Sequence, residues 1–267
     1  MLKINIKKYF IMKKIIIIGA GAMGSAFAVP CLENKNKVTL VGTHLEDDLI
    51  NNIQSKNNFH PALSIELPTK LKVKRYEKLK SILEEGADII VAGVSSVGID
   101  WFVNQIAKSY KKNLPIILLT KGLAIENNEL ITLSDKIKKL LNEQGHTEVN
   151  ISAIKGPCLA AGLANKMRTG TVIANPNIKE TEKLKKIIST NYYSTEVSDD
   201  LTGIELSGAI KNIYSMLIGA SEGLSNSKAP KEIQSKYYLN TSASLIHRSI
   251  SEMVEFVSFY GGRADTV

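Results

Sequence analysis

Residues 13–24 read KKIIIIGAGAMG, a short apolar run followed at once by a glycine-rich turn. Four consecutive isoleucines at residues 15–18 favour a strand that is buried on both faces. A secretory signal peptide would show a small-residue cleavage site after such a run, whereas here the turn opens a helical stretch. The segment therefore predicts the first strand, turn and helix of an α/β domain.

The turn has the pattern Gly-x-Gly-x-x-Gly. In this pattern Gly19 allows the tight turn, Gly21 lets the backbone approach a pyrophosphate, and Gly24 lets the helix pack closely on the strand. The N–H groups at the helix start, at Ala22 and Met23, then attract phosphate. These five residues predict a dinucleotide-binding site.

Strand-like and helical stretches alternate along the chain as far as about residue 198. We expect strands at residues 13–18, 37–41, 70–74, 88–94, 115–118, 150–154, 170–174 and 193–197. We expect helices at residues 23–32, 46–55, 76–84, 96–110, 128–142 and 179–188. This alternation predicts an α/β fold with a Rossmann-type, doubly wound parallel sheet.

From about residue 199 the pattern is helical only, with stretches at residues 202–223 and 232–261. We therefore expect a dinucleotide-binding domain over residues 1–200 and an all-helical domain beginning at residues 201–267. Two long helices bury little surface by themselves, so we expect them to pack on the first domain or on a second copy of the chain. We also expect the helical domain to be incomplete at Val267.

The composition is that of a soluble globular protein. Of the 267 residues, 44% are hydrophobic and 22% charged, which excludes collagen, a long disordered chain and a pure coiled coil. No run of about 18 apolar residues predicts a membrane span. The net charge of +8 fits either an anionic small molecule or a lysine-rich surface, and the scattered basic residues argue against nucleic acid. Two cysteines, Cys31 and Cys158, favour a reducing compartment, the cytoplasm.

The residues after the second strand bear on the choice of cofactor. Thr43 and His44 stand where an acidic residue would hold the ribose of NAD. The acidic residues Glu46, Asp47 and Asp48 come slightly later and also suit the first turn of a helix. The sequence leaves NAD and NADP both open, and it predicts no metal ion.

Three polar motifs follow later strands, at the edge of the sheet where ligands bind in such folds. Ser95 lies in VSSVG and either contacts a cofactor or caps a helix. Lys121 lies in TKG and points either into the cleft or into solvent. Gly156 lies in KGPCLA, a fixed turn with exposed N–H groups. Cys158 in the same motif has no histidine nearby in sequence, which favours a small buried thiol over a nucleophile.

The segment GIELSGAIKN, residues 203–212, places Lys211 and Asn212 inside a helix directly after small residues. A glycine inside a helix costs about 1 kcal/mol relative to alanine, so Gly208 indicates close approach of a backbone or a ligand. A lysine that faces such a cleft has a lowered pKa and can act as an acid or a base. An exposed lysine on a packed helix is the alternative.

Taken in order, GAGAMG, VSSVG, TKGL, KGPCLA and GIELSGAIKNIYSMLIG resemble the NAD(P)-dependent glycerol-3-phosphate dehydrogenase family. The resemblance covers residues 13–267, and NFHPAL at residues 58–63 is similar to a loop of that family. It implies hydride transfer between NADH or NADPH and C2 of dihydroxyacetone phosphate or glycerol 3-phosphate, which supplies phospholipid synthesis. A homodimer is a further expectation.

The resemblance implies Lys211 as the general acid or base and Lys121 as a second catalytic group. It implies substrate contacts at Lys121, Gly156, Cys158, Lys211 and Asn212. The whole expected cofactor set is Gly19, Gly21, Ala22, Met23, Gly24, Thr43, His44, Ser95, Lys121 and Ala160.

The chain also departs from the family pattern. Cys158 stands where serine is frequent, Ala161-Gly162 where a charged pair is frequent, and Arg168 where proline is frequent. In the family, the final GGRADTV leads into Gly-Asp and Arg-Asn segments that hold the substrate phosphate, and the chain stops before them. Two alternatives therefore stand beside the dehydrogenase: a non-catalytic dinucleotide-binding protein, and a related β-hydroxyacid dehydrogenase, against which the TKG and AIKN motifs argue.

Overall fold

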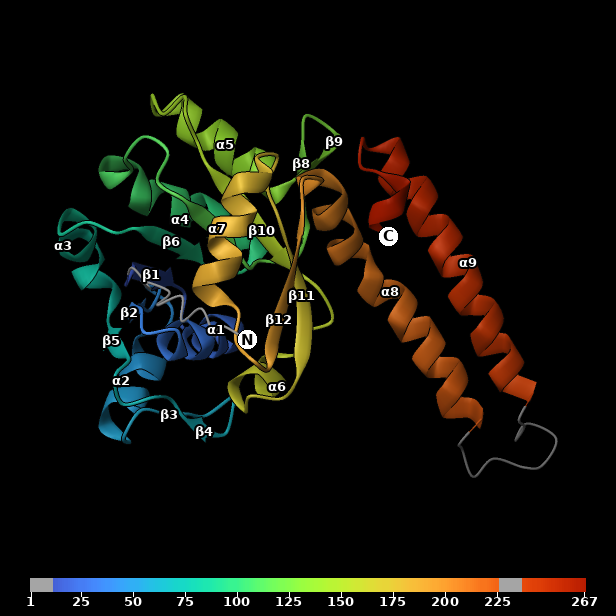
Figure 1. The fold of residues 1–267 in the computed structure, drawn as a ribbon, viewed down its shortest axis with the longest axis horizontal. Coiled ribbons are helices and arrows are strands. Elements are labelled where there is room, and N and C mark those ends of the chain that lie inside the picture. The colour runs from blue at the N-terminus through green and yellow to red at the C-terminus, as the bar shows by residue number, and fades with distance from the viewer. Residues whose placement is uncertain (1–11, 226–236) are drawn as a thin grey trace, which may run out of the picture.

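The computed structural model describes residues 12–225 and 237–267. In that part of the chain, an eight-stranded sheet has the order β12-β11-β10-β7-β6-β1-β2-β5 (Figure 1). Its strands are β1 (Lys14–Ile18), β2 (Lys37–Val41), β5 (Lys72–Lys74), β6 (Ile89–Ala92), β7 (Ile116–Leu118), β10 (Ile151–Lys155), β11 (Thr169–Ala174) and β12 (Tyr193–Ser198). Each expected strand is present, although most boundaries differ by one to three residues. The Rossmann-type α/β prediction is confirmed.

Helices cover both faces of the sheet. They are α1 (Ala22–Glu33), α2 (Asp47–Ser55), α3 (Leu79–Glu84), α4 (Ile99–Ile106), α5 (Leu133–Glu143), α6 (Ala160–Ala164) and α7 (Ile178–Ile188). Short 3-10 turns η1 (Tyr76–Lys78), η2 (Ser96–Gly98) and η3 (Ala107–Ser109) flank α3 and α4. The expected helices at residues 76–84 and 96–110 therefore each divide into α and 3-10 parts.

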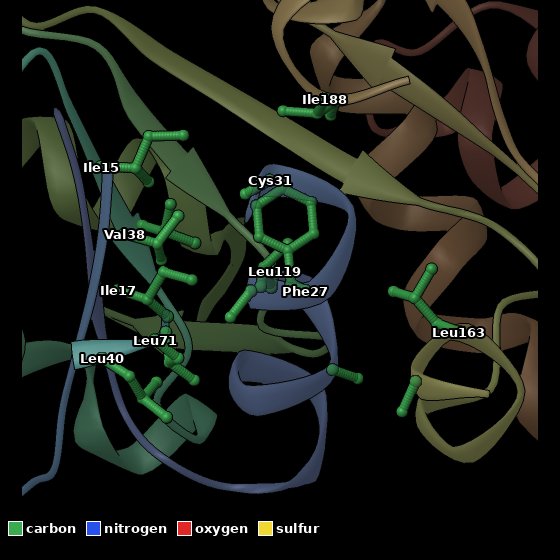
Figure 2. Packing of buried hydrophobic residues seen from close by; sticks show 14 of the residues in the cluster. Ile15, Ile17, Phe27, Cys31, Val38, Leu40, Leu71, Leu119, Leu163 and Ile188 are labelled. Carbon is green, nitrogen blue, oxygen red and sulfur yellow. The ribbon is translucent and has the colours of Figure 1, made fainter. Parts of the chain in front are cut away.

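The isoleucine run of β1 contributes to two separate cores, because successive side chains of a strand point to opposite faces. Ile15 and Ile17 belong to a cluster with Phe27 and Cys31 of α1, shown in Figure 2. Ile16 and Ile18 belong to a second cluster under α3, α4, α5 and the start of the long C-terminal helix. Burial of one such side chain contributes about 1.5–3 kcal/mol, so the run anchors both layers of helices on the first strand.

The sheet is not parallel throughout. The six described strands from β10 to β5 are parallel, but β11 pairs antiparallel with β10, and β12 runs parallel to β11. A parallel pair needs a full crossover, usually a helix. The link between β10 and β11 holds only the five-residue α6, which packs beside α1, so the chain returns in the opposite direction.

Two small hairpins were not predicted: β3 (Phe59–His60) with β4 (Ile65–Glu66), and β8 (Leu123–Glu126) with β9 (Glu129–Thr132). The helix expected at residues 128–142 is therefore wrong over its first five residues. Asn127 and Asn128 form the turn of the second hairpin with φ values of +50° and +64°, a conformation that asparagine tolerates well. Helix α5 starts only after Thr132, whose Oγ1 accepts the N–H of Asp135.

The C-terminal part is helical, as expected. Helices α8 (Leu201–Ser225) and α9 (Tyr237–Phe259) lie side by side and extend away from the sheet (Figure 1). The second helix was expected from residue 232, and its first part lies outside the described residues, as do residues 1–11 of the first expected domain. A final turn, η4 (Ala264–Thr266), returns to the start of α8. No helix in residues 12–225 or 237–267 is long and apolar enough to cross a membrane.

Asp200 links the start of α8 to the segment that follows α9. Its carboxylate accepts the N–H of Gly203 at 2.8 Å, the N–H of Arg263 at 2.8 Å and the hydroxyl of Thr266 at 2.5 Å. A Cβ at Gly262 would lie 2.6 Å from the Cα of Gly203, so the two segments touch backbone to backbone. The position of α9 therefore depends on the same residues that begin α8.

Candidate active site

Four of the predicted motifs follow neighbouring parallel strands. The glycine turn follows β1, VSSVG follows β6, TKG follows β7 and KGPCLA follows β10. These strands are adjacent in the sheet, so their carboxyl ends meet at one edge. The chain runs outward to β2 on one side of β1 and to β6 on the other, which makes this edge the topological switch point where doubly wound folds bind ligands.

The glycine turn fits the cradle expected for a dinucleotide. Gly19 has a φ of +107°, in the left-handed region that favours glycine. A Cβ at Gly24 would lie 2.2 Å from the carbonyl oxygen of Gly19, so helix and strand touch there. A Cβ at Gly21 would meet nothing closer than 3.7 Å, which leaves its surface open toward a ligand. Ala22 and Met23 follow as the first residues of α1, where N–H groups lack partners within the helix.

Three side chains outside the predicted cofactor set hold the peptide of Ala20. Its N–H donates to Oε2 of Glu46 at 2.9 Å. Its carbonyl oxygen accepts from Ser25 Oγ at 2.9 Å and lies 3.0 Å from Nε2 of the buried His60. Because Nδ1 of His60 accepts the N–H of Leu63 at 3.3 Å, the ring proton lies on Nε2 and is donated to Ala20. The NFHPAL segment thus supports the glycine turn through the hydrogen bond from His60 to Ala20.

The residues after β2 and β6 flank this turn. The N–H of Thr43 donates to Oε2 of Glu46 at 2.7 Å. The ring of His44 lies 5.2 Å from Trp101 and 6.3 Å from Tyr76, centroid to centroid. Ser95 is exposed and its side chain makes no capping hydrogen bond to η2, so its hydroxyl stays available to a ligand.

A cavity of about 20 Å³ lies at the ends of β7 and β10. It is lined by four of the predicted residues, Met23, Lys121, Gly156 and Cys158, and by Lys155. The structure therefore brings the start of α1 together with the TKG and KGPCLA loops. Gly156 has a φ of +147° and a Cβ there would lie 3.0 Å from the Cα of Thr171, so the turn needs glycine.

Lys155 was not among the predicted site residues, and it is almost fully buried. Its Nζ donates to the carbonyl oxygens of Thr120, at 2.5 Å, and Leu118, at 3.5 Å. Burial lowers the pKa of this ammonium to about 8, Glu205 opposes that shift, and the charge of Lys121 adds to it. Lys155 thus fixes the loop that carries Lys121 and places a second basic group behind it.

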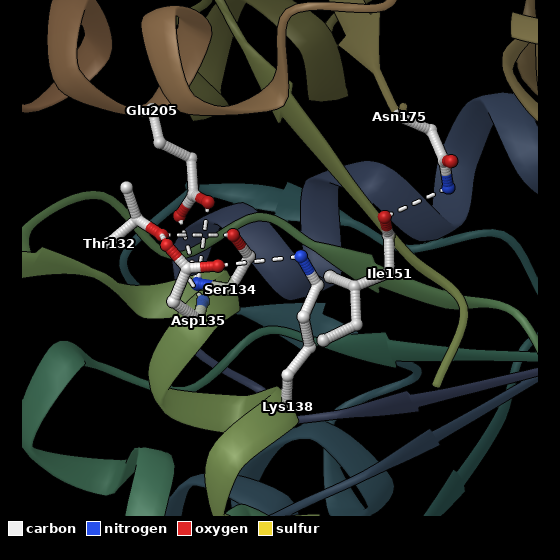
Figure 3. A network of polar contacts seen from close by, with 7 residues as sticks. All are labelled: Thr132, Ser134, Asp135, Lys138, Ile151, Asn175 and Glu205. Atoms are coloured by element: carbon white, nitrogen blue, oxygen red, sulfur yellow. Dashed lines mark hydrogen bonds and ion pairs between the residues drawn. The ribbon is translucent and has the colours of Figure 1, made fainter. Parts of the chain in front are cut away.

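Glu205 of α8 is also buried and was missed. Its two carboxylate oxygens each lie 3.3 Å from the N–H of Ser134, in the first turn of α5 (Figure 3). Burial raises the pKa of Glu205, while Lys155 and the Ser134 hydrogen bonds lower it. The carboxylate therefore joins α8 to the first turn of α5, and its charge interacts with that of Lys155.

Cys158 is a buried thiol, as the sequence favoured. Burial raises its pKa, opposed by Thr169 and by the charge of Lys121. A thiol that resists ionisation is a poor nucleophile. Lys121 itself is exposed at the mouth of the cavity.

Lys211 and Asn212 do not line this cavity. Lys211 is half-buried in α8, and Asn212 is exposed. One turn earlier, Gly208 contacts the side chain of Lys155, since a Cβ at Gly208 would lie 3.1 Å from Cγ of the lysine. Residues three apart share one face of a helix, so Lys211 lies on the face of α8 that packs toward Lys155.

Two further predictions concern Ala160 and metal ions. Ala160 is the first residue of α6, half-buried against the core beneath the glycine turn. Among residues 12–225 and 237–267 no three His, Cys, Asp or Glu side chains cluster as metal ligands would.

Comparison with known proteins agrees with this arrangement. The sequence profile of the NAD-dependent glycerol-3-phosphate dehydrogenase N-terminus matches residues 14–181, and that of the C-terminus matches residues 200–267. The NADP(+)-dependent glycerol-3-phosphate dehydrogenase of Archaeoglobus fulgidus is 32% identical over 94% of this chain and 71% of its own length. The glycerol-3-phosphate dehydrogenase [NAD(P)+] of Mesoplasma florum is 31% identical over 95% and 71%.

Solved structures give the same result. The crystal structure of glycerol-3-phosphate dehydrogenase from Coxiella burnetii superposes with a TM-score of 0.77 at 26% identity, over 96% of this chain and 71% of that one. A 3-hydroxyisobutyrate dehydrogenase from Mycobacterium tuberculosis shares only the fold, with a TM-score of 0.54 at 9% identity over 80% of this chain and 64% of that one. The chain belongs to the NAD-dependent glycerol-3-phosphate dehydrogenase family.

Proposed function

We propose that this protein transfers a hydride between NADH or NADPH and C2 of dihydroxyacetone phosphate, forming glycerol 3-phosphate, or runs the reverse reaction. The observation that supports the proposal most directly is that Met23, at the start of α1, Lys121 and Lys155 line one cavity at the switch point of the sheet. The cofactor-binding unit would be residues 1–200, and residues 201–267 would contribute the substrate side.

The residues of the glycine turn fit a dinucleotide. The N–H groups of Ala22 and Met23 would hold the pyrophosphate above the open face of Gly21. The adenosine end would lie toward Thr43 and His44. The nicotinamide end would lie toward Met23, Ser95, Lys121 and Ala160. When bound there, the cofactor supplies or accepts the hydride.

The side chains of the protein would contribute a proton to the reaction and positive charge to substrate binding. Lys211 would donate a proton to the C2 oxygen during reduction and remove it during oxidation. Lys121 would hold the substrate, Asn212 would orient it, and the backbone at Gly156 and Cys158 would contact it. Positioned acid–base groups of this kind contribute about 10²–10⁴-fold to a rate.

The electrostatics of the cavity suit a phosphorylated substrate. Burial, and to a smaller extent the charge of Lys121, lower the pKa of Lys155. The buried carboxylate of Glu205 offsets part of this positive charge through its interaction with Lys155. An anion at the cavity mouth would therefore meet positive charge from Lys121 first.

The test is an absorbance assay at the nicotinamide band with dihydroxyacetone phosphate and either NADH or NADPH. Oxidation of the cofactor that depends on dihydroxyacetone phosphate is the expected result. Cofactor binding without any turnover would instead support a non-catalytic dinucleotide-binding protein. Reduction of a ketoacid, with dihydroxyacetone phosphate ignored, would support a β-hydroxyacid dehydrogenase.

We further propose a homodimer in the cytoplasm, where the product would enter phospholipid synthesis. Support for the dimer comes from large apolar side chains exposed on α8 and α9. These are Ile213, Met216, Leu217, Leu224, Ile246 and Ile250. Exposed apolar groups gathered on neighbouring helices mark interaction surfaces. Analytical ultracentrifugation would show a mass of two chains, and a monomer at micromolar concentration would contradict the dimer.

A further inference from the structure

We propose that Glu46 selects the cofactor: its carboxylate accepts the adenosine ribose hydroxyls and excludes a 2′-phosphate, so that the protein binds NADH in preference to NADPH. This inference rests on the dinucleotide site of the proposed function and adds a specificity that the sequence left open. It also departs from the cofactor in the name of the Archaeoglobus fulgidus relative.

Glu46 does not stand at the end of β2, where an acidic residue would have been recognised in the sequence. It comes five residues later, as the N-cap residue of α2. The N–H of Glu46 donates to the carbonyl oxygen of Thr43 at 3.0 Å, which closes a turn over the strand end. This turn carries the Glu46 side chain back to the glycine loop, although the sequence placed the residue in an ordinary first turn of a helix.

The two carboxylate oxygens of Glu46 have different surroundings. Oε2 accepts two backbone N–H groups, from Ala20 at 2.9 Å and from Thr43 at 2.7 Å. Oε1 faces the bare Cα of Gly21, 3.7 Å from where a Cβ would stand. Oε2 therefore fixes the side chain against the glycine turn, and Oε1 is directed at the open surface of Gly21. A fixed acceptor in this position suits a diol, which brings two O–H donors.

Arg75, which directly follows β5, is already paired with carboxylates. The guanidinium of Arg75 donates to Asp47, with Nη2 to Oδ2 at 2.7 Å and Nε to Oδ1 at 3.3 Å. Arg75 also lies 3.4 Å from a carboxylate oxygen of Glu77. The ring of His44 lies beside Trp101 and Tyr76. A 2′-phosphate would need a cation here, and Lys74, the exposed last residue of β5, is one candidate at this edge.

Charge therefore discriminates between the cofactors. A ribose 2′-hydroxyl can donate to Oε1 of Glu46, whereas a 2′-phosphate is itself an anion and an acceptor. Two like charges a few ångströms apart in a partly buried site repel strongly. Oε1 of Glu46 thus accepts the ribose 2′-hydroxyl of NADH and repels the 2′-phosphate of NADPH.

The experiment measures binding, so that it does not depend on turnover. NADH and NADPH are titrated into the whole chain by calorimetry, and 5′-AMP and 2′,5′-ADP are titrated as probes of the adenosine half alone. We expect NADH to bind at least tenfold more tightly than NADPH, and 5′-AMP more tightly than 2′,5′-ADP. Glu46→Gln keeps an oxygen acceptor for Ala20 and Thr43 but removes the charge, and it should reduce the NADH:NADPH ratio at least tenfold.

Asp48→Asn is the matched control, because Asp48 is exposed in the first turn of the same helix. It removes one negative charge without touching the loop and should change the ratio less than threefold. Lys74→Ala tests the cation at the end of β5 and should leave the affinity for NADPH unchanged. Circular dichroism melting confirms that each variant is folded.

Three results would overturn the inference. The first is a wild-type protein that binds NADPH as tightly as NADH, the second a Glu46→Gln variant with an unchanged ratio, and the third an equal effect of Asp48→Asn. A preference for NADPH together with turnover would refute the role of Glu46 alone. Failure of all four nucleotides to bind would refute the dinucleotide site and the proposed function with it.

Discussion

Gly208 of α8 lies directly against the side chain of Lys155 in β10: a Cβ at position 208 would stand 3.1 Å from Cγ and 3.2 Å from Cβ and Cδ of the lysine. This contact lets the helix that carries Lys211 approach the sheet. The lysine has little freedom to move aside, because its Nζ is hydrogen-bonded to Thr120 and its side chain is buried. The small residue therefore sets the distance between α8 and the cavity.

Gly208→Ala is accordingly expected to lose packing, and Gly219→Ala is its control in the same helix. A Cβ at Gly219 meets nothing within 4 Å, so that variant should gain up to about 1 kcal/mol in unfolding free energy from helix propensity. Gly208→Ala gains the same propensity but compresses Lys155, and we expect it to be at least about 1 kcal/mol less stable than Gly219→Ala. Urea unfolding measures the unfolding free energy of both variants. Equal values would show that the Lys155 side chain moves aside at no cost.

The glycine turn allows a similar paired prediction. Gly24→Ala places a Cβ 2.2 Å from the carbonyl oxygen of Gly19, which the backbone cannot accommodate, so the variant should be destabilised by several kcal/mol or fail to fold. Gly21→Ala meets nothing within 3.4 Å and should fold normally while losing at least tenfold in NADH affinity, because the methyl group occupies the cofactor's surface. Thermal melting measures the loss of stability, and calorimetric titration measures the loss of NADH affinity. Normal NADH binding by Gly21→Ala would contradict the proposal that the cofactor lies on the surface of Gly21.

The sequence predicted the strands of the large sheet, but it predicted neither the antiparallel pair β10–β11 nor the residues that support the site. The isoleucine run and the glycine turn are local signals, and both lie where they were expected. Glu46 and His60 act on Ala20 across 26 and 40 residues, and Glu205 acts on Ser134 across 71 residues. Their local patterns are those of an ordinary helix cap, a loop and a helix face. Only the packing of the folded chain gives these residues their roles.

The hairpin at residues 123–132 differs, because its signal is local to the sequence. The pair Asn127-Asn128 between two short apolar runs is typical of a tight hairpin turn. The helix expected at residues 128–142 instead begins at Leu133, after the second strand of this hairpin. The polar cap at Thr132 marks where that helix begins.

The buried pair of Lys155 and Glu205 should behave as a coupled unit. Lys155→Met removes the positive charge that opposes the buried Glu205 carboxylate, so we expect a loss of about 3–5 kcal/mol in unfolding free energy. Glu205→Gln should also destabilise the protein, and the double variant should lose less than the sum of the two. Urea unfolding of the four proteins provides the cycle. Additive losses would show that the two side chains do not interact.

The same lysine predicts a pH dependence. The pKa of Lys155 is about 8 in the folded protein, below its ordinary value of 10.5, so between these pH values the unfolded chain binds more protons. Stability of the wild type relative to Lys155→Met should therefore rise as the pH increases from 8 to 10.5. Below pH 8 the difference should be constant. A difference that falls over the alkaline range would mean that the folded protein holds the proton more tightly than the unfolded chain.

Lys211 carries the last prediction, because the proposed chemistry depends on its proton. Lys211→Ala should lose about 10²–10⁴-fold in turnover while NADH affinity stays within about twofold. Lys211→Arg keeps the positive charge but cannot release a proton near neutral pH, so it should be nearly as inactive. The exposed Lys186 on α7 lies outside the site, and Lys186→Ala should retain full activity. Steady-state kinetics with dihydroxyacetone phosphate, together with NADH titration, distinguish the outcomes. Activity restored by arginine would reassign Lys211 from proton transfer to holding an anion, and full activity of the alanine variant would remove it from the site.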